Sequence, residues 1–435
     1  MLIRFYVGNY SSYRDRQELS MTSGKTSGHE NHQVDVDGVP ILRLAAVYGA
    51  NASGKSNLIK AMRSMRDMVV SDRVIASDRY FRPDPDMRDS PSVFEVEIGL
   101  GDRIYSYGFQ CILSRREVVD EWLYRLSVDE DNELVFSRIG DRVQHGFSDR
   151  AGQRLDLYAE DLVGQRGRLF LNIMGRRARM QDGELSVFND VFDWFKDRLR
   201  FVDSKYPFSP GDLLTDDDFK KLNEVISSFG TGINSIGYDR RDGLDEMIPP
   251  ELLDRLRRDL GRSVIGVGRR GYASMNDYRV HLEDDAVVFD EIVYRHNGDR
   301  VTYRSDEESD GTRKLYGLLT STFLGMDHCT YVMDELDSGL HPQLTYRFLQ
   351  LFAEDPAKRG SQLLFTTHES SLMDFQLLRR DEIWFVQKRP EGESELYSLE
   401  DFNERNDRKL EKAYREGRYG GIPLFTTVYP PGGRR

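Results

Sequence analysis

The spacing of apolar and polar residues predicts strands and a helix in the first part of the chain. Residues 2–7 and 41–47 are short apolar runs typical of strands, and a polar segment, 21–37, connects them. We expect the two runs to pair with each other across a loose loop. Apolar residues then recur every three or four positions from 56 to 70, which predicts a helix directly after the second strand.

Further along, the pattern changes twice. A segment rich in proline, aspartate and arginine, 82–91, ends the first helical unit. Alternating runs at 93–100 and 104–113 then predict the two strands of a hairpin. From about 151 to 280 the apolar spacing is mainly helical and is interrupted by glycine-rich breaks, so we expect a compact helical lobe there.

Composition narrows the class of protein. Apolar residues make up 39% and charged residues 31% of the chain, as in ordinary globular proteins. We see no apolar stretch of the length that a signal peptide or a membrane span needs, so we expect a cytoplasmic protein without a membrane partner. Cys111 and Cys329 stand at no metal-ligand spacing, and we expect both to be core thiols in a reducing compartment.

Two polar clusters suggest binding but have plainer explanations. The net charge of −13 argues against indiscriminate binding to nucleic acid, which needs a basic surface. A local basic strip is possible, but a solvated helix face paired with nearby acids is our preferred interpretation of Arg166, Arg168, Arg176, Arg177 and Arg179. His29 and His32 lie in the polar segment 21–37, where we expect an exposed loop in preference to a metal site.

A glycine-rich segment carries the strongest chemical signal. Residues 49–56 match the phosphate-binding loop pattern and stand between a predicted strand and a predicted helix. The backbone N–H groups of such a loop surround phosphates, and the positive end of the helix dipole favours them. We expect ATP and Mg²⁺ as cofactors, with Lys55 at the β- and γ-phosphates and Ser56 as a Mg²⁺ ligand. The predicted ATP-binding set is Gly49, Asn51, Ala52, Ser53, Gly54, Lys55 and Ser56.

A second chemical element follows an apolar strand at 330–333. Asp334 and Glu335 come directly after this strand, which suits carboxylates at the carboxyl edge of a sheet beside the phosphates. We expect Asp334 to bind the Mg²⁺ shell through water, and Glu335 to polarise the attacking water as the catalytic base. Another strand, 362–365, runs into Thr366-Thr367-His368.

With these motifs the sequence resembles the ABC ATPase family. The resemblance implies that Asp334 and Glu335 are the Walker B acids. It further implies a D-loop around Asp337, which belongs to the nucleotide-binding set, and a catalytic switch histidine at His368 that senses the γ-phosphate.

The same resemblance extends to two more sites. Ser309 and Gly311 lie at a helix start similar to the ABC signature, where they would contact the ATP of an opposite subunit. Asp310 and Thr312 replace the glycine and glutamine that are usual there. Gln110, at the end of a predicted strand, is the expected Q-loop residue and metal ligand.

The resemblance implies an α/β fold, the ABC-type P-loop ATPase head, in which a mixed sheet packs with helices and a helical lobe is inserted. Residues 1–150 would form the first ATPase lobe with the phosphate loop, and 151–290 the helical insertion. Residues 291–435 would carry the signature, the Walker B acids, the switch histidine and the C-terminal part of the head. The phosphate loop begins at 49 and the signature at 309, so 309 minus 49, or 260, positions separate them. This separation is too long for a compact transporter subunit and too short for the long arms of an SMC protein.

Within the family, the start at 5–13 and the ending at 414–423 resemble the OLD-like stand-alone group, which includes RloA, AbiL-type ATPases and the PARIS subunit AriA. That group is associated with antiviral defence against phage and acts beside separate effectors. The resemblance implies a homodimer or higher homo-oligomer with ATP sites between subunits. Its ATPase would sense DNA or a phage protein and control a separate nuclease or toxin.

Two other interpretations stay open at this point. One is a DNA-repair or chromosome-associated clamp of the RecF or SMC type, which would bind duplex DNA without a partner and in a salt-dependent way. The other is a catalytically silent ATP-binding scaffold, which would release no phosphate.

Overall fold

The computed structural model describes most of the chain, in two compact units. The described residues are 1–24, 26, 28–71, 73–127, 131–176, 183–202, 216–245, 248–261, 273–275, 278–284, 286–402 and 410–421. The first unit comprises Met1–Phe201, Asp327–Leu336 and Ala353–Arg435, and the second comprises Val202–Met326 and Asp337–Phe352. The first unit therefore extends beyond residue 150, where we expected the inserted lobe to begin.

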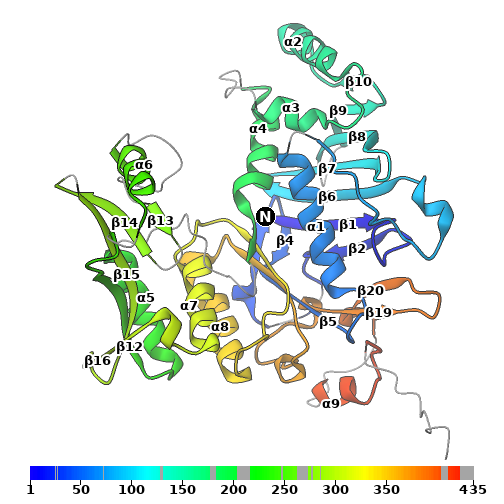
Figure 1. The fold of residues 1–435 in the computed structure, drawn as a ribbon. Coiled ribbons are helices and arrows are strands. Elements are labelled where there is room, and N and C mark those ends of the chain that lie inside the picture. Colours follow the sequence, from blue (N-terminus) through cyan, green and yellow to red (C-terminus); the bar gives the residue numbers. More distant parts are fainter. Residues whose placement is uncertain are drawn as a thin grey trace, which may run out of the picture. The chain divides into compact units, whose positions relative to one another are not determined.

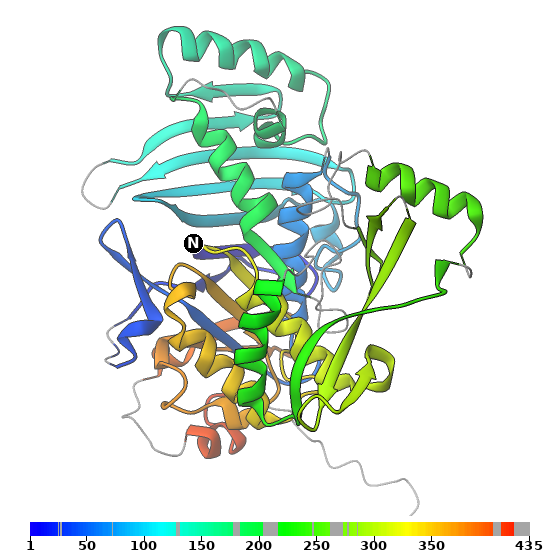
Figure 2. The same cartoon turned by 90° about the vertical axis from the view of Figure 1, so that its left-hand side faces the viewer.

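An antiparallel sheet of seven strands forms one part of the first unit, in the order β10-β9-β8-β7-β6-β1-β2 (Figures 1 and 2). The strands are β1 (Leu2–Gly8), β2 (Gln17–Ser20), β6 (Ser92–Leu100), β7 (Arg103–Ile112), β8 (Glu117–Leu126), β9 (Glu133–Ile139) and β10 (Arg142–His145). The predicted hairpin is confirmed as β6 and β7, in which Leu100 stands opposite Arg103.

A second sheet of the first unit has the order β11-β17-β18-β5-β19-β20. Its strands are β5 (Leu44–Tyr48), β11 (Leu199–Val202), β17 (Thr330–Met333), β18 (Gln362–Thr366), β19 (Ile383–Lys388) and β20 (Ser394–Ser398). β17, β18, β5 and β19 run parallel to one another. Every residue of β5, β17 and β18 is buried, as expected for parallel strands that are covered on both faces.

The predicted pairing of residues 2–7 with 41–47 is wrong. β1 pairs with β2 and β6 in the antiparallel sheet, whereas β5 pairs with β18 and β19. The apolar run at 41–47 is itself divided by Arg43, a buried residue whose guanidinium donates to the carbonyl oxygens of Ala353 and Lys358, both at 2.8 Å. Composition does not show which strand an apolar run pairs with. The partners of these two runs include strands that are far away in the sequence.

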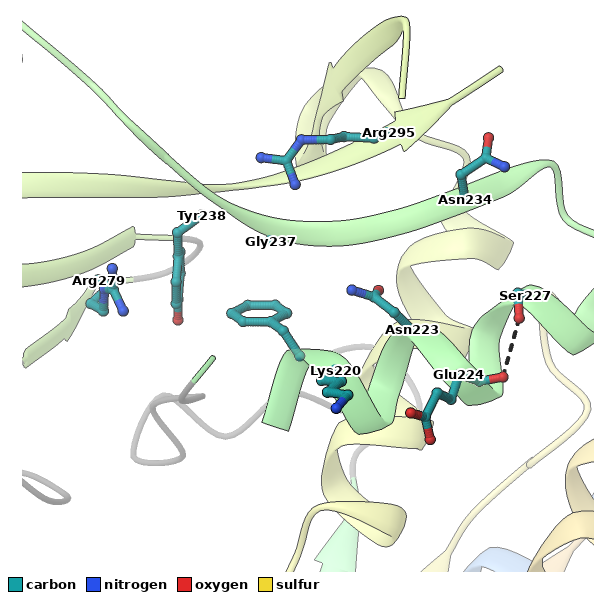
Figure 3. A pocket seen from close by; sticks show the side chains of 10 residues that line it. Lys220, Asn223, Glu224, Ser227, Asn234, Gly237, Tyr238, Arg279 and Arg295 are labelled. Carbon is teal, nitrogen blue, oxygen red and sulfur yellow. Dashed lines mark hydrogen bonds between the residues drawn. The ribbon is translucent and has the colours of Figure 1, made fainter. Parts of the chain in front are cut away.

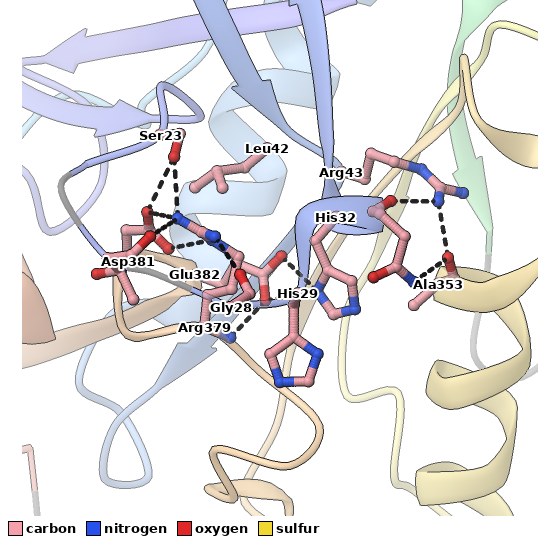
Figure 4. A network of polar contacts seen from close by, with 12 residues as sticks. Ser23, Gly28, His29, His32, Leu42, Arg43, Ala353, Arg379, Asp381 and Glu382 are labelled. Carbon is pink, nitrogen blue, oxygen red and sulfur yellow. Dashed lines mark hydrogen bonds and ion pairs between the residues drawn. The ribbon is translucent and has the colours of Figure 1, made fainter. Parts of the chain in front are cut away.

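The described residues of the polar segment between these runs pack against the rest of the first unit (Figure 4). It contains β3 (Gln33–Val36), which pairs with β4 (Val39–Leu42). His32 is buried, and its Nδ1 lies 2.9 Å from Glu382 Oε1. Burial raises the pKa of the Glu382 carboxyl even though the hydrogen bond with His32 lowers it. The expectation of an exposed loop is therefore wrong for His32, because a carboxylate distant in sequence gives its ring a buried partner.

The helices of the first unit pack against its two large sheets. They are α1 (Lys55–Val70), α2 (Asp149–Ala159), α3 (Phe170–Arg176), α4 (Ser186–Asp193) and α9 (Leu410–Arg415), of which α9 lies at Tyr48 of β5 and Phe385 of β19. α1 confirms the predicted helix at 56–70 and buries Leu58, Met62 and Met65 on one side. These side chains share a hydrophobic core with Phe5 and Val47, which belong to different sheets. The core therefore fixes α1 against both sheets of this unit.

The second unit combines helices with an antiparallel sheet in the order β12-β15-β14-β13, with β16 paired to β15. Its strands are β12 (Ile233–Arg240), β13 (Ala273–Met275), β14 (Tyr278–Glu283), β15 (Ala286–His296) and β16 (Val301–Arg304). Its helices are α5 (Asp216–Ile226), α6 (Pro250–Gly261), α7 (Asp310–Phe323) and α8 (Pro342–Glu354), the last of which ends in the first unit. The stretch predicted as helical thus contains strands as well. A buried run such as β15 cannot be told from a buried helix by its apolar residues alone.

Two further observations concern the cysteines and the character of the helices. Both cysteines are free thiols and buried, as expected. In the part of the chain that the structure describes, no helix combines the length and the apolar character that crossing a membrane requires.

Candidate nucleotide-binding site

The segment 49–54 connects β5 to α1, as the phosphate-loop pattern predicts. Gly54 has a φ of 122°, and a side chain there would also lie 2.3 Å from Ser394 Oγ. Only glycine meets both conditions without strain. The N–H groups of Asn57 and Leu58 donate to the Gly54 carbonyl at 2.9 and 3.1 Å, which starts the helix at the loop. The positive end of the α1 dipole is therefore directed at the loop, where it favours an anion.

The ammonium group of Lys55 lies inside this loop. Lys55 is buried, and its Nζ donates to the carbonyl oxygens of Gly49 at 2.7 Å and Ala50 at 3.1 Å. The same Nζ lies 3.4 Å from Nδ1 of His368. The structure thus brings the predicted phosphate-binding lysine together with the predicted switch histidine, although 313 positions separate them in the sequence.

The carboxyl ends of three parallel strands bring the predicted residues to one edge of the sheet. Met333 of β17 stands opposite Phe365 of β18, and Thr366 of β18 stands opposite Val47 of β5. The acidic pair at 334–335, the histidine at 368 and the phosphate loop each follow one of these ends. This is the edge at which parallel α/β sheets bind ligands.

Thr366 connects the acidic pair to the neighbouring strand. Its buried Oγ1 donates to Asp334 Oδ1 at 2.6 Å and accepts from the Glu335 N–H at 2.8 Å. Glu335 has a φ of 53°, a left-handed conformation that non-glycine residues rarely adopt, and its side chain is exposed. Thr366 is a residue of this site that was not predicted from the sequence. A hydroxyl residue at a strand end, two positions before the histidine, was the available signal.

We expect Thr366→Val to slow, by about tenfold, the ATP hydrolysis that the sequence predicts, while ATP affinity changes little. The variant keeps the shape of the side chain, but it loses both hydrogen bonds, and a bond to a charged group contributes about 1.5–3 kcal/mol. Steady-state phosphate release and nucleotide titration measure the two effects. Thr366→Ser retains the hydroxyl and is expected to keep most of the activity. Equal turnover in the valine variant and the wild-type protein would show that Thr366 does not orient the acids.

Residues from three other parts of the first unit support the phosphate loop. The Tyr13 hydroxyl donates to the Gly54 carbonyl at 3.0 Å, and Asn57 Nδ2 donates to Ser12 Oγ at 2.9 Å. The Ser394 N–H donates to the Ser12 carbonyl at 2.7 Å. Sequence reasoning missed these contacts, because nothing in their spacing relates the end of β1 to the β19–β20 hairpin.

The loop has the features that phosphate binding requires. Ser53 Oγ is buried and has no hydrogen-bond partner in the described part of the chain. A buried hydroxyl without a partner is costly, and a phosphate oxygen would satisfy it. Among the described residues, no group of three or more histidine, cysteine or acidic side chains could bind a metal by itself. Mg²⁺ commonly uses one or two protein ligands together with phosphate and water, and the assignment of Ser56 and Asp334 to it stays a prediction.

Gln110 lies in the antiparallel sheet. It belongs to β7, where it stands opposite Val93 and Asp120 and is half-buried. The hydrogen bonds described above for Lys55, Asp334 and His368 do not involve Gln110. The role of Gln110 as Q-loop residue and metal ligand therefore stays a prediction.

Ser309 lies in the second unit at the start of α7. Its Oγ accepts a hydrogen bond from the Thr312 N–H at 3.1 Å, so Ser309 is the N-cap of the helix. Both Ser309 and Asp310 are exposed. A capped helix start with an exposed serine is compatible with the predicted contact to a phosphate of another subunit, which stays a prediction.

The predicted signature and D-loop contact each other within the second unit. Lys314 Nζ of α7 donates to the Ser338 carbonyl, and a side chain at Gly311 would lie 2.9 Å from the Gly339 carbonyl oxygen. The D-loop turn is closed by a hydrogen bond from the Leu340 N–H to the Asp337 carbonyl at 3.1 Å. The absence of a side chain at Gly311 therefore permits close packing against the turn that carries Asp337.

The second unit also has a pocket of about 690 Å³ between α5 and β12 (Figure 3). Two arginines line it. Arg279 forms an ion pair with Asp290 at 2.6 Å and lies 4.2 Å above the Tyr238 ring, and Arg295 pairs with Asp239. Because the charge of both arginines is compensated by carboxylates, the pocket gives no specific reason to assign an anionic ligand.

The phosphate loop after β5, the acids after β17 and the histidine after β18 together define a P-loop ATPase fold of the ABC or AAA type. The chain belongs to the family described as "AAA domain, putative AbiEii toxin, Type IV TA system", whose model matches residues 44–374. Among curated proteins, none matches this chain.

Solved structures similar to the chain include two SMC heads. One is the SmcHead bound to the C-winged helix domain of ScpA, with 13% identity and a TM-score of 0.38 over 92% of this chain and 99% of that one. The other is the SMC head domain from Thermotoga maritima, with 16% identity and a TM-score of 0.34 over 91% of this chain and 98% of that one.

Proposed function

We propose that the chain binds and hydrolyses ATP with Mg²⁺ and uses this cycle as a conformational switch. The observation that carries the proposal is the meeting of Lys55 Nζ and His368 Nδ1, 3.4 Å apart. A buried ammonium in a glycine-rich loop favours a polyanionic phosphate chain, and a histidine beside it can contact the terminal phosphate.

In the proposed reaction the residues of the chain have separate tasks. Lys55 binds the β- and γ-phosphates, and His368 contacts the γ-phosphate. Mg²⁺, when bound, neutralises charge on the phosphates, with Ser56 and Asp334 as its protein-side groups. Thr366 keeps Asp334 oriented through the 2.6 Å hydrogen bond. The exposed Glu335 carboxylate accepts a proton from the attacking water, which needs a base that solvent can reach.

We further propose that the active form is a homodimer or a higher homo-oligomer with ATP between subunits. The exposed Ser309 at the start of α7 supports this arrangement, since the N–H groups at a helix start can bind a γ-phosphate that is presented by another copy. Because Gly311 packs on the D-loop turn, the signature and Asp337 would approach that phosphate as one surface.

Ser309→Arg tests this arrangement. We expect the variant to fold and to bind ATP as the wild-type protein does, because Ser309 is exposed and belongs to the other unit than Lys55. ATP-dependent dimerisation and turnover should both be lost, since a large cation would occupy the place of the partner's phosphate. Light scattering with and without ATP measures dimerisation. Normal turnover in this variant would show that the site is not shared between subunits.

At the level of the cell, we propose an ATPase sensor or scaffold of an antiphage defence system that controls a separate nuclease or toxin. Two observations support this role. The family description names a putative AbiEii toxin of a type IV toxin-antitoxin system, and the beginning and end of the chain resemble the OLD-like group. The net charge of −13 also disfavours a clamp that binds DNA by itself.

Two measurements test the proposed role. Purified wild-type protein should release phosphate from ATP, and without a partner it should show little affinity for duplex DNA at physiological salt. No phosphate release would contradict the switch and favour a silent scaffold. Tight, salt-dependent binding to DNA by the chain alone would instead favour the clamp.

A further inference from the structure

The C-terminal motif at 414–421 has no task in the proposed chemistry, yet it lies beside the phosphate loop. Tyr414 of α9 stacks on Phe385 with 5.6 Å between ring centroids and meets the edge of Tyr48 at 6.0 Å. Tyr48 is the last residue before Gly49. A side chain added at Gly421 would lie 3.6 Å from the Gly49 Cα, which is an ordinary van der Waals distance, so the turn lies beside Gly49. The motif therefore packs on Tyr48, directly before the loop, and lies beside the first residue of the loop.

The backbone of this motif explains its glycines. Gly420 and Gly421 have φ values of 69° and 65°, a pair of left-handed residues that other amino acids disfavour. The Tyr414 hydroxyl donates to the Gly421 carbonyl at 3.1 Å, which ties the turn back to α9. The turn at 417–421 and α9 thus form one element, drawn in red beyond the ends of β5 and β19 in Figure 1.

The same element contacts the segment that follows His368. Ser370 Oγ donates to Glu411 Oε1 at 3.2 Å and accepts from Arg415 Nε at 3.0 Å. Glu411 and Arg415 stand one helical turn apart on α9 and form an ion pair at 2.6 Å. A single hydroxyl, two positions after His368, therefore connects the switch segment to two side chains of α9.

Two sets of contacts in the first unit connect Lys55 with the segment that contains His368. Lys55 Nζ lies 3.4 Å from His368 Nδ1 directly, and it also donates to the Gly49 carbonyl at 2.7 Å. Gly421 lies beside Gly49, and the element that carries Gly421 is hydrogen-bonded to the switch segment through Ser370. A shift of α9 would consequently act at both ends of the Lys55–His368 pair.

We propose that α9 and the turn at 417–421 position His368 relative to Lys55, and that Ser370 and Tyr414 are the positioning residues of this element. The inference rests on the proposed ATPase function and assigns a task to a motif outside the phosphate-binding residues. Aromatic packing alone would account for the burial of Tyr414. It gives no reason for the Ser370 hydroxyl to bond with both Glu411 and Arg415.

The decisive comparison is Ser370→Ala with Ser371→Ala in the full chain. Ser371 is the exposed neighbour on the same short helical turn, so Ser371→Ala is the matched control. For Ser370→Ala we expect kcat to fall about threefold to tenfold, with the thermal midpoint close to that of the control, because one hydrogen-bonded hydroxyl is removed from a partly exposed site. Ser370→Thr, which retains the hydroxyl, should restore turnover.

A second measurement separates this role from the proposed reaction. Because His368 would contact the γ-phosphate, Ser370→Ala should also lower the ratio of ATP to ADP affinity about threefold, even without turnover. If the wild-type protein releases no phosphate, the proposed hydrolysis is contradicted. The ratio of ATP to ADP affinity in Ser370→Ala would then still test whether α9 and the turn at 417–421 position His368. A kcat and an affinity ratio in Ser370→Ala that both equal those of Ser371→Ala would overturn the inference.

Tyr414→Phe tests the end of this element that lies beside the phosphate loop. The variant keeps the ring that packs on Phe385 and removes only the hydroxyl that donates to Gly421. We expect the dissociation constant for ATP to rise about threefold, because the turn against Gly49 becomes looser. If the dissociation constant for ATP is unchanged, the turn at 417–421 does not influence ATP binding by the phosphate loop.

Discussion

Lys55→Ala is expected to weaken ATP binding at least about a hundredfold, as measured by titration with a fluorescent ATP analogue. The ammonium is the charged side chain that the structure places within the loop, where it already donates to the carbonyl oxygens of Gly49 and Ala50. Two charge-assisted hydrogen bonds to phosphate contribute about 3 kcal/mol or more, which corresponds to this loss of affinity.

The matched control for this variant is Lys60→Ala. Lys60 belongs to the same helix, α1, but is exposed, and it should bind ATP like the wild-type protein. Circular dichroism of Lys55→Ala should still show a folded protein. ATP affinity equal to that of the control would refute the assignment of residues 49–56 as the phosphate-binding loop.

Glu335→Gln is expected to lower turnover about a hundredfold to ten-thousandfold while ATP binding survives, which is the range that loss of a general base produces. The amide keeps the size of the side chain but cannot accept the proton of the attacking water. The hydrogen bond between Thr366 and Asp334, and those from Lys55 to the carbonyl oxygens of Gly49 and Ala50, do not involve the Glu335 side chain. ATP should therefore still bind, and the closed dimer should accumulate.

Phosphate release and light scattering on the same sample measure both effects of Glu335→Gln. Glu391→Gln, which changes an exposed acid in the turn between β19 and β20, is the control and should behave as the wild-type protein. Turnover at the control rate would remove Glu335 as the base. Loss of ATP binding would mean that the acid has a structural task. If ATP hydrolysis releases the proposed effector, cells that carry Glu335→Gln should also lose defence against phage.

The local elements of the candidate site could be predicted from the sequence because each of them is contiguous. The loop at 49–56 lies between a strand and a helix, and the acids at 334–335 directly follow an apolar strand, as the structure confirms. Such patterns depend on backbone conformation and on the nearest neighbours, which a few consecutive residues determine. The hairpin of β6 and β7 could be predicted for the same reason.

Contacts between distant segments could not be predicted in this way. The pairing of β1 with β6, and not with β5, the burial of His32 against Glu382 and the strands within 151–290 all differ from the expectations. In each case an apolar run or a polar side chain had several partners that were equally suitable by composition. The choice among them depends on which surfaces the whole unit buries together.

The sequence by itself therefore determined the chemistry that this protein can offer: a glycine-rich loop with Lys55, two acids at a strand end, and a histidine after a later strand. The tertiary structure decided which of these groups meet. It placed Lys55 Nζ 3.4 Å from His368, joined Asp334 to Thr366, and set the C-terminal turn against Gly49. The physical reason is that parallel strands align their carboxyl ends only through long-range pairing, and the free energy of that pairing comes from burial that no short segment can provide alone.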